Sequence, residues 1–343
     1  MLALACGLVG ASAAHGAAWS TGTRVPGRIE LAGSHVEWLI PLRGDALRLY
    51  DARAGHRPRR VQTLPGPGPD RESFVDGFAA SASTVALVRS GLVGPHAVPG
   101  GTDWLVGARG GRLVQTAHCD TLPGTGPGSV DVWGTRVATI RCDETVQVED
   151  RADPSATAIV GHDAQAVRLA GRYVAWLEHP RGMWTQPDVL VVYDLQAGSE
   201  SYRASAPDGR SRVGSFDLAD DGTLAFGYGP QSEAGAVAWA SPAQPTAHRV
   251  PLAKRVLYTL KVARGRIAFA RNRDPDDRFG EIGVMRIGAS QPRLLTRRGA
   301  GLVLDLGGSS IAFATRDCRG VRVIRSSVAR GAAAARPRRC KRG

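Results

Sequence analysis

The stretch from Val167 to Gly198 reads VRLAGRYVAWLEHPRGMWTQPDVLVVYDLQAG and predicts a small antiparallel sheet. It contains two alternating apolar runs, YVAWLE and DVLVVYDL, separated by a polar loop that carries Gly and Pro. A shorter run, AVRL, comes before a turn centred on Gly171. Apolar runs divided by such turns are typical of strands that follow one another as a meander.

The same hairpin recurs along the chain, for example as IELAGSHVEWLI (29–40), VDVWGTRVATIRC (130–142) and LDLGGSSIAFATR (304–316). A third strand and a weaker fourth run follow most copies. The spacing averages about 46 residues, close to the period of four-stranded propeller blades. The equivalent apolar position is occupied by Val36, Val85, Val137, Val174, Leu224, Ile267 and Ile311.

These seven copies predict an all-β fold, a seven-bladed β-propeller of four-stranded antiparallel blades. Closing the ring removes the exposed strand edges that an open array would leave. Six or eight blades remain alternatives, because the second copy (78–89) lacks the glycine turn and the spacing varies. A tandem of β-sandwiches is the other candidate fold, but it would not repeat one hairpin at this period.

The segment FDLADDGTLAF (216–226) resembles the repeat of TolB-like (PD40-type, WD40-like) propellers. In that family a strand ends at an Asp-Gly turn that is followed by an aliphatic residue, Ala and Phe. GRIAF (265–269) and SSIAF (309–313) match the second half of the repeat. Asp220 stands where the family usually has Pro, and its typical member has six blades. The resemblance implies a propeller, and such repeats serve both binding proteins and enzymes.

The two ends of the chain differ from the repeats. Residues 1–18 are apolar, end in small residues and are expected to be a signal peptide, with candidate cleavage points after Ala13, Gly16 or Ala18. This run is too short to span a membrane. Residues 19–328 would form the single propeller domain, and residues 329–343 a basic C-terminal tail. The protein is therefore expected to be secreted or held at the cell envelope.

The chain has a formal net charge of +13, and almost all of its positive charge comes from Arg. A basic surface attracts anionic partners. No basic patch interleaved with aromatic residues is present, so nucleic acid is not expected as a partner. We expect a monomer whose partner is a protein or an envelope polymer.

Four cysteines lie beyond the leader, and an even number in an exported chain suggests two disulfides. Cys119 ends the fourth strand of one blade, and Cys142 ends the second strand of the next blade. Both positions fall on the same rim of a propeller, which predicts the pair Cys119–Cys142. Cys318 occupies the matching place in the last copy, so we pair it with Cys340 of the tail.

Long loops on one face of the propeller are the expected binding region, because binding residues concentrate on loops held by a rigid scaffold. These loops include 90–102, 178–188 and 271–281. Packing of Trp184 onto its own blade is the competing interpretation. The candidate binding residues are His96, Met183, Trp184, Gln186, Arg271, Asp274, Asp276 and Arg278.

No cofactor is expected, although the acidic residues Asp274, Asp276, Asp277 and Glu281 leave calcium as an alternative. The spacing of an EF-hand is absent, and neighbouring arginines could neutralise these carboxylates. No nucleophile elbow, zinc-protease helix, P-loop or dinucleotide fingerprint occurs. We therefore favour a binding scaffold and keep a hydrolase or lyase with a site at the channel mouth as the alternative.

Overall fold

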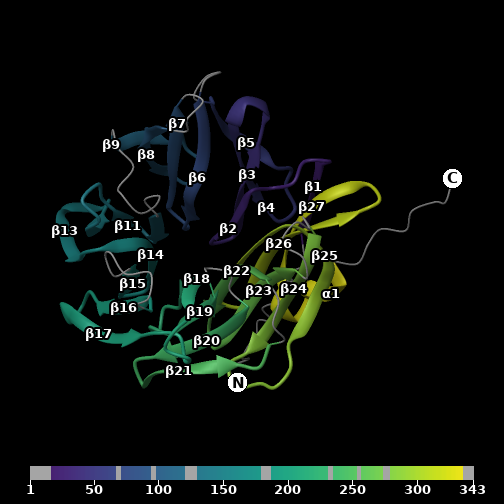
Figure 1. Ribbon diagram of the computed structural model, residues 1–343. Coiled ribbons are helices and arrows are strands. Elements are labelled where there is room, and N and C mark those ends of the chain that lie inside the picture. Colours follow the sequence, from purple (N-terminus) through teal and green to yellow (C-terminus); the bar gives the residue numbers. More distant parts are fainter. Residues whose placement is uncertain are drawn as a thin grey trace, which may run out of the picture.

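The computed structural model describes residues 17–66, 71–93, 98–119, 130–178, 187–230, 235–252, 256–272 and 279–334. Its strands form separate sheets arranged in a ring (Figure 1). Five of these sheets have four antiparallel strands each, in chain order from the channel outward. The sixth sheet has seven strands and resolves into two further blades. The predicted seven-bladed propeller is confirmed.

The five four-stranded blades occupy the first three quarters of the chain. Blade 1 contains β2 (Arg28–Ala32), β3 (His35–Pro41), β4 (Leu47–Arg53) and β5 (Arg59–Leu64), with the short 3-10 helix η1 (Arg43–Asp45) between β3 and β4. Blade 2 contains β6 (Arg71–Ala80), β7 (Thr84–Val93), β8 (Val98–Ala108) and β9 (Val114–Cys119), and blade 3 contains β10 (Val130–Trp133), β11 (Arg136–Ile140), β12 (Val146–Asp150) and β13 (Asp153–Gly161). Blade 4 contains β14 (Ala164–Ala170), β15 (Tyr173–Glu178), β16 (Val189–Asp194) and β17 (Ser199–Ala204), and blade 5 contains β18 (Arg212–Leu218), β19 (Leu224–Gly229), β20 (Ala236–Ser241) and β21 (Gln244–Val250).

Blades 6 and 7 share one long strand. The seven-stranded sheet contains β22 (Val256–Ala263), β23 (Arg266–Asn272), β24 (Phe279–Arg286), β25 (Arg293–Gly307), β26 (Ser310–Asp317), β27 (Gly320–Ser327) and β1 (Ala17–Gly22). The first part of β25 pairs with β24, and its second part pairs with β26 after a break in register between Gly299 and Leu304. β25 is therefore the outer strand of blade 6 and the inner strand of blade 7.

The N-terminal strand β1 closes the ring by pairing with β27 (Figure 1). Blade 7 thus takes three strands from the C-terminal part of the chain and one from the N-terminal part. Trp19 of β1 packs on Trp38 of blade 1 with ring centroids 5.9 Å apart. Its Nε1–H donates a hydrogen bond to the carbonyl oxygen of His56 at 2.9 Å. The closing strand is consequently fixed to both of the blades that it joins.

The core lies between neighbouring blades. In β15 five of six residues are buried, whereas the outer strand β17 is mostly exposed. Phe226, Phe269 and Phe313, the aromatic residues of the repeated Ala-Phe pairs, are completely buried in the second strands of blades 5, 6 and 7. Each large side chain packs against an adjacent blade, so the repeated hairpin buries its apolar faces only when the ring is complete.

The second copy of the repeat forms its turn without glycine. Ser81 Oγ accepts hydrogen bonds from the N–H groups of Ser83 and Thr84. The same hydroxyl donates to the carbonyl oxygen of Gly134 in blade 3 at 2.7 Å. A serine hydroxyl can therefore close this turn in place of a glycine conformation, which explains why the repeat is weaker here.

The predicted bond between Cys119 and Cys142 is present, with their Cα atoms 6.0 Å apart. It joins the outer strand of blade 2 to the end of β11 in blade 3. Cys318 is also disulfide-bonded. Its predicted partner Cys340 lies outside the described residues, as do the rest of residues 335–343 and residues 1–16. The described chain ends with the 3-10 helix η3 (Val328–Arg330) and the short helix α1 (Gly331–Ala334). In the described ranges, no helix has the length and apolar character needed to cross a bilayer.

Candidate functional site

The inner strands of the blades bring charged side chains into the central channel. Each inner strand has one equivalent position between two residues that are mostly apolar, as in Ile-Glu-Leu of β2 or Leu-Asp-Leu of β25. In a strand the middle residue of such a triplet lies on the opposite face from its neighbours. The seven equivalent positions are occupied by Glu30, Ala79, Asp131, Arg168, Asp217, Lys261 and Asp305.

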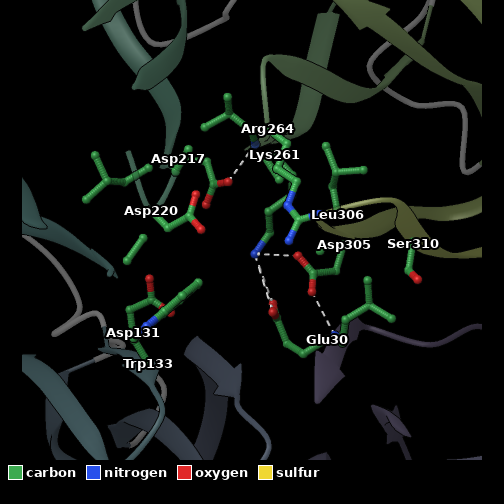
Figure 2. A pocket seen from close by; sticks show the side chains of 18 of the residues that line it. Glu30, Asp131, Trp133, Asp217, Asp220, Lys261, Arg264, Asp305, Leu306 and Ser310 are labelled. Carbon is green, nitrogen blue, oxygen red and sulfur yellow. Dashed lines mark hydrogen bonds and ion pairs between the residues drawn. The ribbon is translucent and has the colours of Figure 1, made fainter. Parts of the chain in front are cut away.

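Lys261 is the centre of this charged ring (Figure 2). Its Nζ lies 3.3 Å from Glu30 Oε1 and 3.2 Å from Asp305 Oδ1. Burial alone would lower the pKa of Lys261, but the carboxylates of Asp305, Glu30, Asp217 and Asp131 together raise it well above its ordinary value. Lys261 is therefore a permanent cation and is not available as a neutral amine nucleophile.

Three aspartates of the ring each connect their own inner strand to the inner strand of the next blade. Asp131 Oδ2 accepts a hydrogen bond from the N–H of Leu169 at 2.8 Å. Asp217 Oδ2 does the same with Val262 at 2.7 Å. Asp305 Oδ2 accepts from the N–H of Leu31, also at 2.7 Å (Figure 2). These bonds join blade 3 to blade 4, blade 5 to blade 6, and blade 7 to blade 1.

The channel carboxyls of Asp217, Asp131 and Glu30 have raised pKa values because burial disfavours their charged form. Burial raises the pKa of Asp217 to about 7, although Lys261 and Arg168 act in the opposite direction. Burial also raises the pKa of Asp131, and it raises that of Glu30 well above its ordinary value. Four acids face two cations in the ring. Lys261 and Arg168 oppose the effect of burial at Asp131 as well.

Two cavities lie on either side of this charged ring. They share Glu30, Asp131 and Lys261, so the charges form the waist of the channel. The larger cavity, about 480 Å³, opens among the turns that join first and second strands. Its mouth carries Trp133, which is 42% exposed, and the charged residues Asp220 and Arg264. This volume is within the range of small-molecule sites.

The smaller cavity, about 240 Å³, is lined by the N-terminal halves of the inner strands. β-bulges shape it, because an extra residue changes the direction of a side chain at that point. The strand register shifts at Asp76 in β6, at Gln165 in β14 and at Tyr258 in β22, and all three residues line the cavity. Burial raises the pKa of Asp76 to about 6, whereas hydrogen bonds from Ser90 act to lower it.

Seven of the eight binding residues predicted from the sequence lie in segments that the structure does not describe. His96, Met183, Trp184, Gln186, Asp274, Asp276 and Arg278 lie outside the described residues. Arg271 is described and is buried. Its Nε lies 3.2 Å from Glu281 Oε2, and its guanidinium lies 5.0 Å from the centre of the Phe269 ring. It thus packs within blade 6. Among the described residues, no group of three or more His, Cys, Asp or Glu is arranged to hold a metal ion.

Sequence reasoning missed the charged ring. The signal was a single charged residue inside the first apolar run of six of the seven copies. Charged residues are rarely buried without a partner, so their recurrence at one repeat position marks a shared environment. Their partners come from different blades and are far apart in sequence.

Comparisons with known proteins identify the fold alone. The chain matches no described protein family and no curated protein. Among solved structures it is similar to Kuenenia stuttgartiensis hydrazine synthase, with a TM-score of 0.56, 11% identity and coverage of 90% of this chain and 97% of that chain. The β-propeller domain of the Trilobed protease from Pyrococcus furiosus gives a TM-score of 0.55 at 7% identity, covering 89% and 98%. A complex of KlAtg21 with the coiled-coil of AgAtg16 gives 0.53 at 9% identity, covering 86% and 96%.

These similarities support a propeller and do not assign an activity. The Trilobed protease domain is described as having an open velcro topology. In the present protein β1 pairs with β27, so its ring is closed by a strand from the other end of the chain.

Proposed function

We propose that the protein is an exported β-propeller, related to TolB-like repeat proteins, that acts as a monomeric binding scaffold for a protein or polymer of the cell envelope. The main support is that the carboxylates in its channel are already engaged in hydrogen bonds and ion pairs within the protein. Asp131, Asp217 and Asp305 hold backbone N–H groups of adjacent blades, and Glu30 holds Lys261. Groups engaged in this way stiffen the ring, and a stiff ring presents fixed surfaces to a partner.

Export is supported by the Cys119–Cys142 bond, since disulfides persist mainly in oxidising compartments. We place the cleavage of the leader after Ala13 or Gly16. Cleavage after Ala18 would remove Ala17 and Ala18, which pair with Arg325 and Ile324 in the closing sheet. The proposal therefore favours a mature chain that retains the whole of β1.

The test is to express the full chain with a C-terminal tag, fractionate the cells and determine the mass of the exported form. We expect a mature protein that begins at Ala14 or Ala17 and contains disulfides. An uncleaved protein that remains reduced in the cytosol would contradict export. This experiment does not depend on knowing the ligand.

The alternative, a hydrolase or lyase, rests on Asp217, because a carboxyl with a pKa near 7 could transfer protons at neutral pH. Purified protein can be tested on chromogenic esters, phosphoesters and glycosides. The decisive pair of variants is Asp217→Asn and Asp220→Asn, since Asp220 is an exposed residue at the mouth of the same cavity. Turnover that is lost only in Asp217→Asn would replace the scaffold proposal with the enzyme. Absence of turnover in wild type supports the scaffold.

A further inference from the structure

A third hollow, about 680 Å³, lies where β24, the middle of β25 and the β26–β27 turn meet. We propose that this hollow, the arginine pocket, binds a phosphate-type oxyanion. The inference deepens the proposed function by naming a ligand class. The described residues of its lining include Phe279, Arg297, Arg298, Arg316, Asp317 and Arg319.

Backbone irregularity places two of the arginines at the rim. In the pairing of β24 with β25 the register shifts between Gly280 and Ile282, so the two residues Arg297 and Arg298 lie opposite the single residue Glu281. The N–H of Arg298 donates to Thr296 Oγ1 at 3.0 Å, and the hydroxyl of Thr315 donates to the carbonyl oxygen of Arg298 at 3.0 Å. Thr315 is 1% exposed. The buried threonine therefore fixes the backbone that presents Arg297 and Arg298, while both of their side chains are exposed.

The β26–β27 turn places Arg319 on the other side. Asp317 Oδ1 accepts the N–H of Arg319 at 2.9 Å, and Asp317 Oδ2 lies 3.0 Å from Arg322 Nε. Gly320 has φ +114°, and a side chain there would collide with the carbonyl oxygen of Gly22. Asp317, the one acidic residue in the described lining of the pocket, is thus engaged with Arg322 and with the turn.

The fourth arginine is oriented by an aromatic ring. The guanidinium of Arg316 lies 4.9 Å from the centre of the Phe279 ring. Stacking on an aromatic face leaves the edges of a guanidinium, which carry its N–H donors, free to bind a ligand. Arg316 is exposed, so these edges can be reached from solvent.

Among the described residues, few carboxylates compensate the positive charge of the pocket. Arg297 lies 4.0 Å from Glu281, and that carboxylate is already 3.2 Å from Arg271. Within the described ranges, no carboxylate oxygen lies within 4 Å of a guanidinium nitrogen of Arg298, Arg316 or Arg319. Like charges held close together repel, and an anion removes that cost. Guanidinium forks that line one hollow from different segments can pair with the oxygens of a phosphate group.

The experiment titrates full-length protein with inorganic phosphate, inorganic polyphosphate and phosphatidylglycerol vesicles in separate arms. The test variant is Arg298→Gln with Arg316→Gln. The control is Arg53→Gln with Arg60→Gln, which removes the same charge from exposed positions on blade 1. We expect the test variant to weaken binding about tenfold or more, the scale of one charge-assisted hydrogen bond. The control should change binding by less than about twofold.

Each arm gives a distinct result. Polyphosphate binding without vesicle binding identifies a polymer as the source, vesicle binding identifies a lipid headgroup, and binding of all three probes identifies the phosphate group itself. Equal losses of binding affinity in the test and control variants would show that net charge alone causes the binding, and this would overturn the proposal. Absence of binding to all three probes would overturn it as well. Thermal unfolding of both variants confirms that the fold is kept. Export and the propeller scaffold would survive either negative result.

Discussion

Asp305 Oδ2 accepts a hydrogen bond of 2.7 Å from the N–H of Leu31, a residue 274 positions away in sequence. The bond joins the inner strands of the last and first blades at the wall of the channel. At the periphery the same two blades are joined by the packing of Trp19 on Trp38. The ring is therefore closed twice, once by a charged hydrogen bond near its axis and once by an aromatic contact near its rim.

Replacing Asp305 with Ala should destabilise the protein by about 2–4 kcal/mol. The change leaves the N–H of Leu31 unpaired and removes one of the carboxylates next to Lys261. Asp305→Asn keeps an acceptor for Leu31 and should cost less. Asp131→Ala is the matched control, since Asp131 makes the same bond away from the closure. Urea unfolding measures all three, and a larger loss for Asp131→Ala would contradict the role of Asp305 in closure.

Trp19→Ala should detach β1 from blade 1 and cost about 3–5 kcal/mol, the range for removing a buried large aromatic side chain. Trp19 is 6% exposed, and its replacement removes both its ring contact with Trp38 and its hydrogen bond to the carbonyl oxygen of His56. Trp133→Ala, at a residue 42% exposed, should cost less than about 1 kcal/mol. Thermal unfolding gives the stabilities, and limited proteolysis should cut near the N-terminus only in Trp19→Ala. Similar effects of the two substitutions would refute the closing contact.

Stability should fall as the pH rises from about 4 to about 7. Burial raises the pKa of Glu37 and of Asp217 to about 7, whereas unfolded carboxyls titrate near pH 4. In that interval the folded protein holds protons that the unfolded chain has released, so the free energy of unfolding decreases with rising pH. Above pH 7 both states are ionised and this loss is complete. Thermal unfolding between pH 4.5 and pH 8 measures the trend.

Glu37→Gln tests the origin of this pH dependence. Glu37 is completely buried, and its Oε1 accepts the N–H of Gly110 at 3.3 Å. Its Oε2 has no hydrogen-bond partner among the residues that the structure describes. The neutral amide avoids the cost of a buried charge. The variant should gain stability relative to wild type as the pH rises, by about 1.4 kcal/mol for each unit of the pKa difference. Parallel pH profiles for the two proteins would show that Glu37 is not responsible.

The architecture could be predicted from sequence because it is local and repeated. Each hairpin has its apolar alternation and its turn within about a dozen residues, and the repeat period gave the blade count. The Cys119–Cys142 pair followed from the order of strands within a blade. The strand β1 could not be recognised, because AAWSTG matches no copy of the repeat and its partner lies at the other end of the chain.

The channel chemistry escaped prediction for a related reason. Lys261, Glu30 and Asp305 come from blades 6, 1 and 7 and meet only after the ring has closed. A lone charged residue in an apolar run gives no sign of the blade that holds its partner. The arginine pocket likewise combines a register break, a glycine turn and one aromatic ring, each ordinary in isolation.

The last prediction concerns the cross-link between blades 2 and 3. Cys119 and Cys142 are 23 positions apart, and a disulfide over such a loop stabilises a protein by about 3 kcal/mol, mainly by restricting the unfolded chain. Replacing both residues with Ala should therefore lower the unfolding temperature, and adding a reductant should lower that of wild type toward the same value. The paired variant Cys318→Ala with Cys340→Ala is the control, and it should keep the bond between Cys119 and Cys142. Peptide mapping of unreduced protein checks the connectivity, and a peptide that joins Cys119 to Cys318 would contradict it.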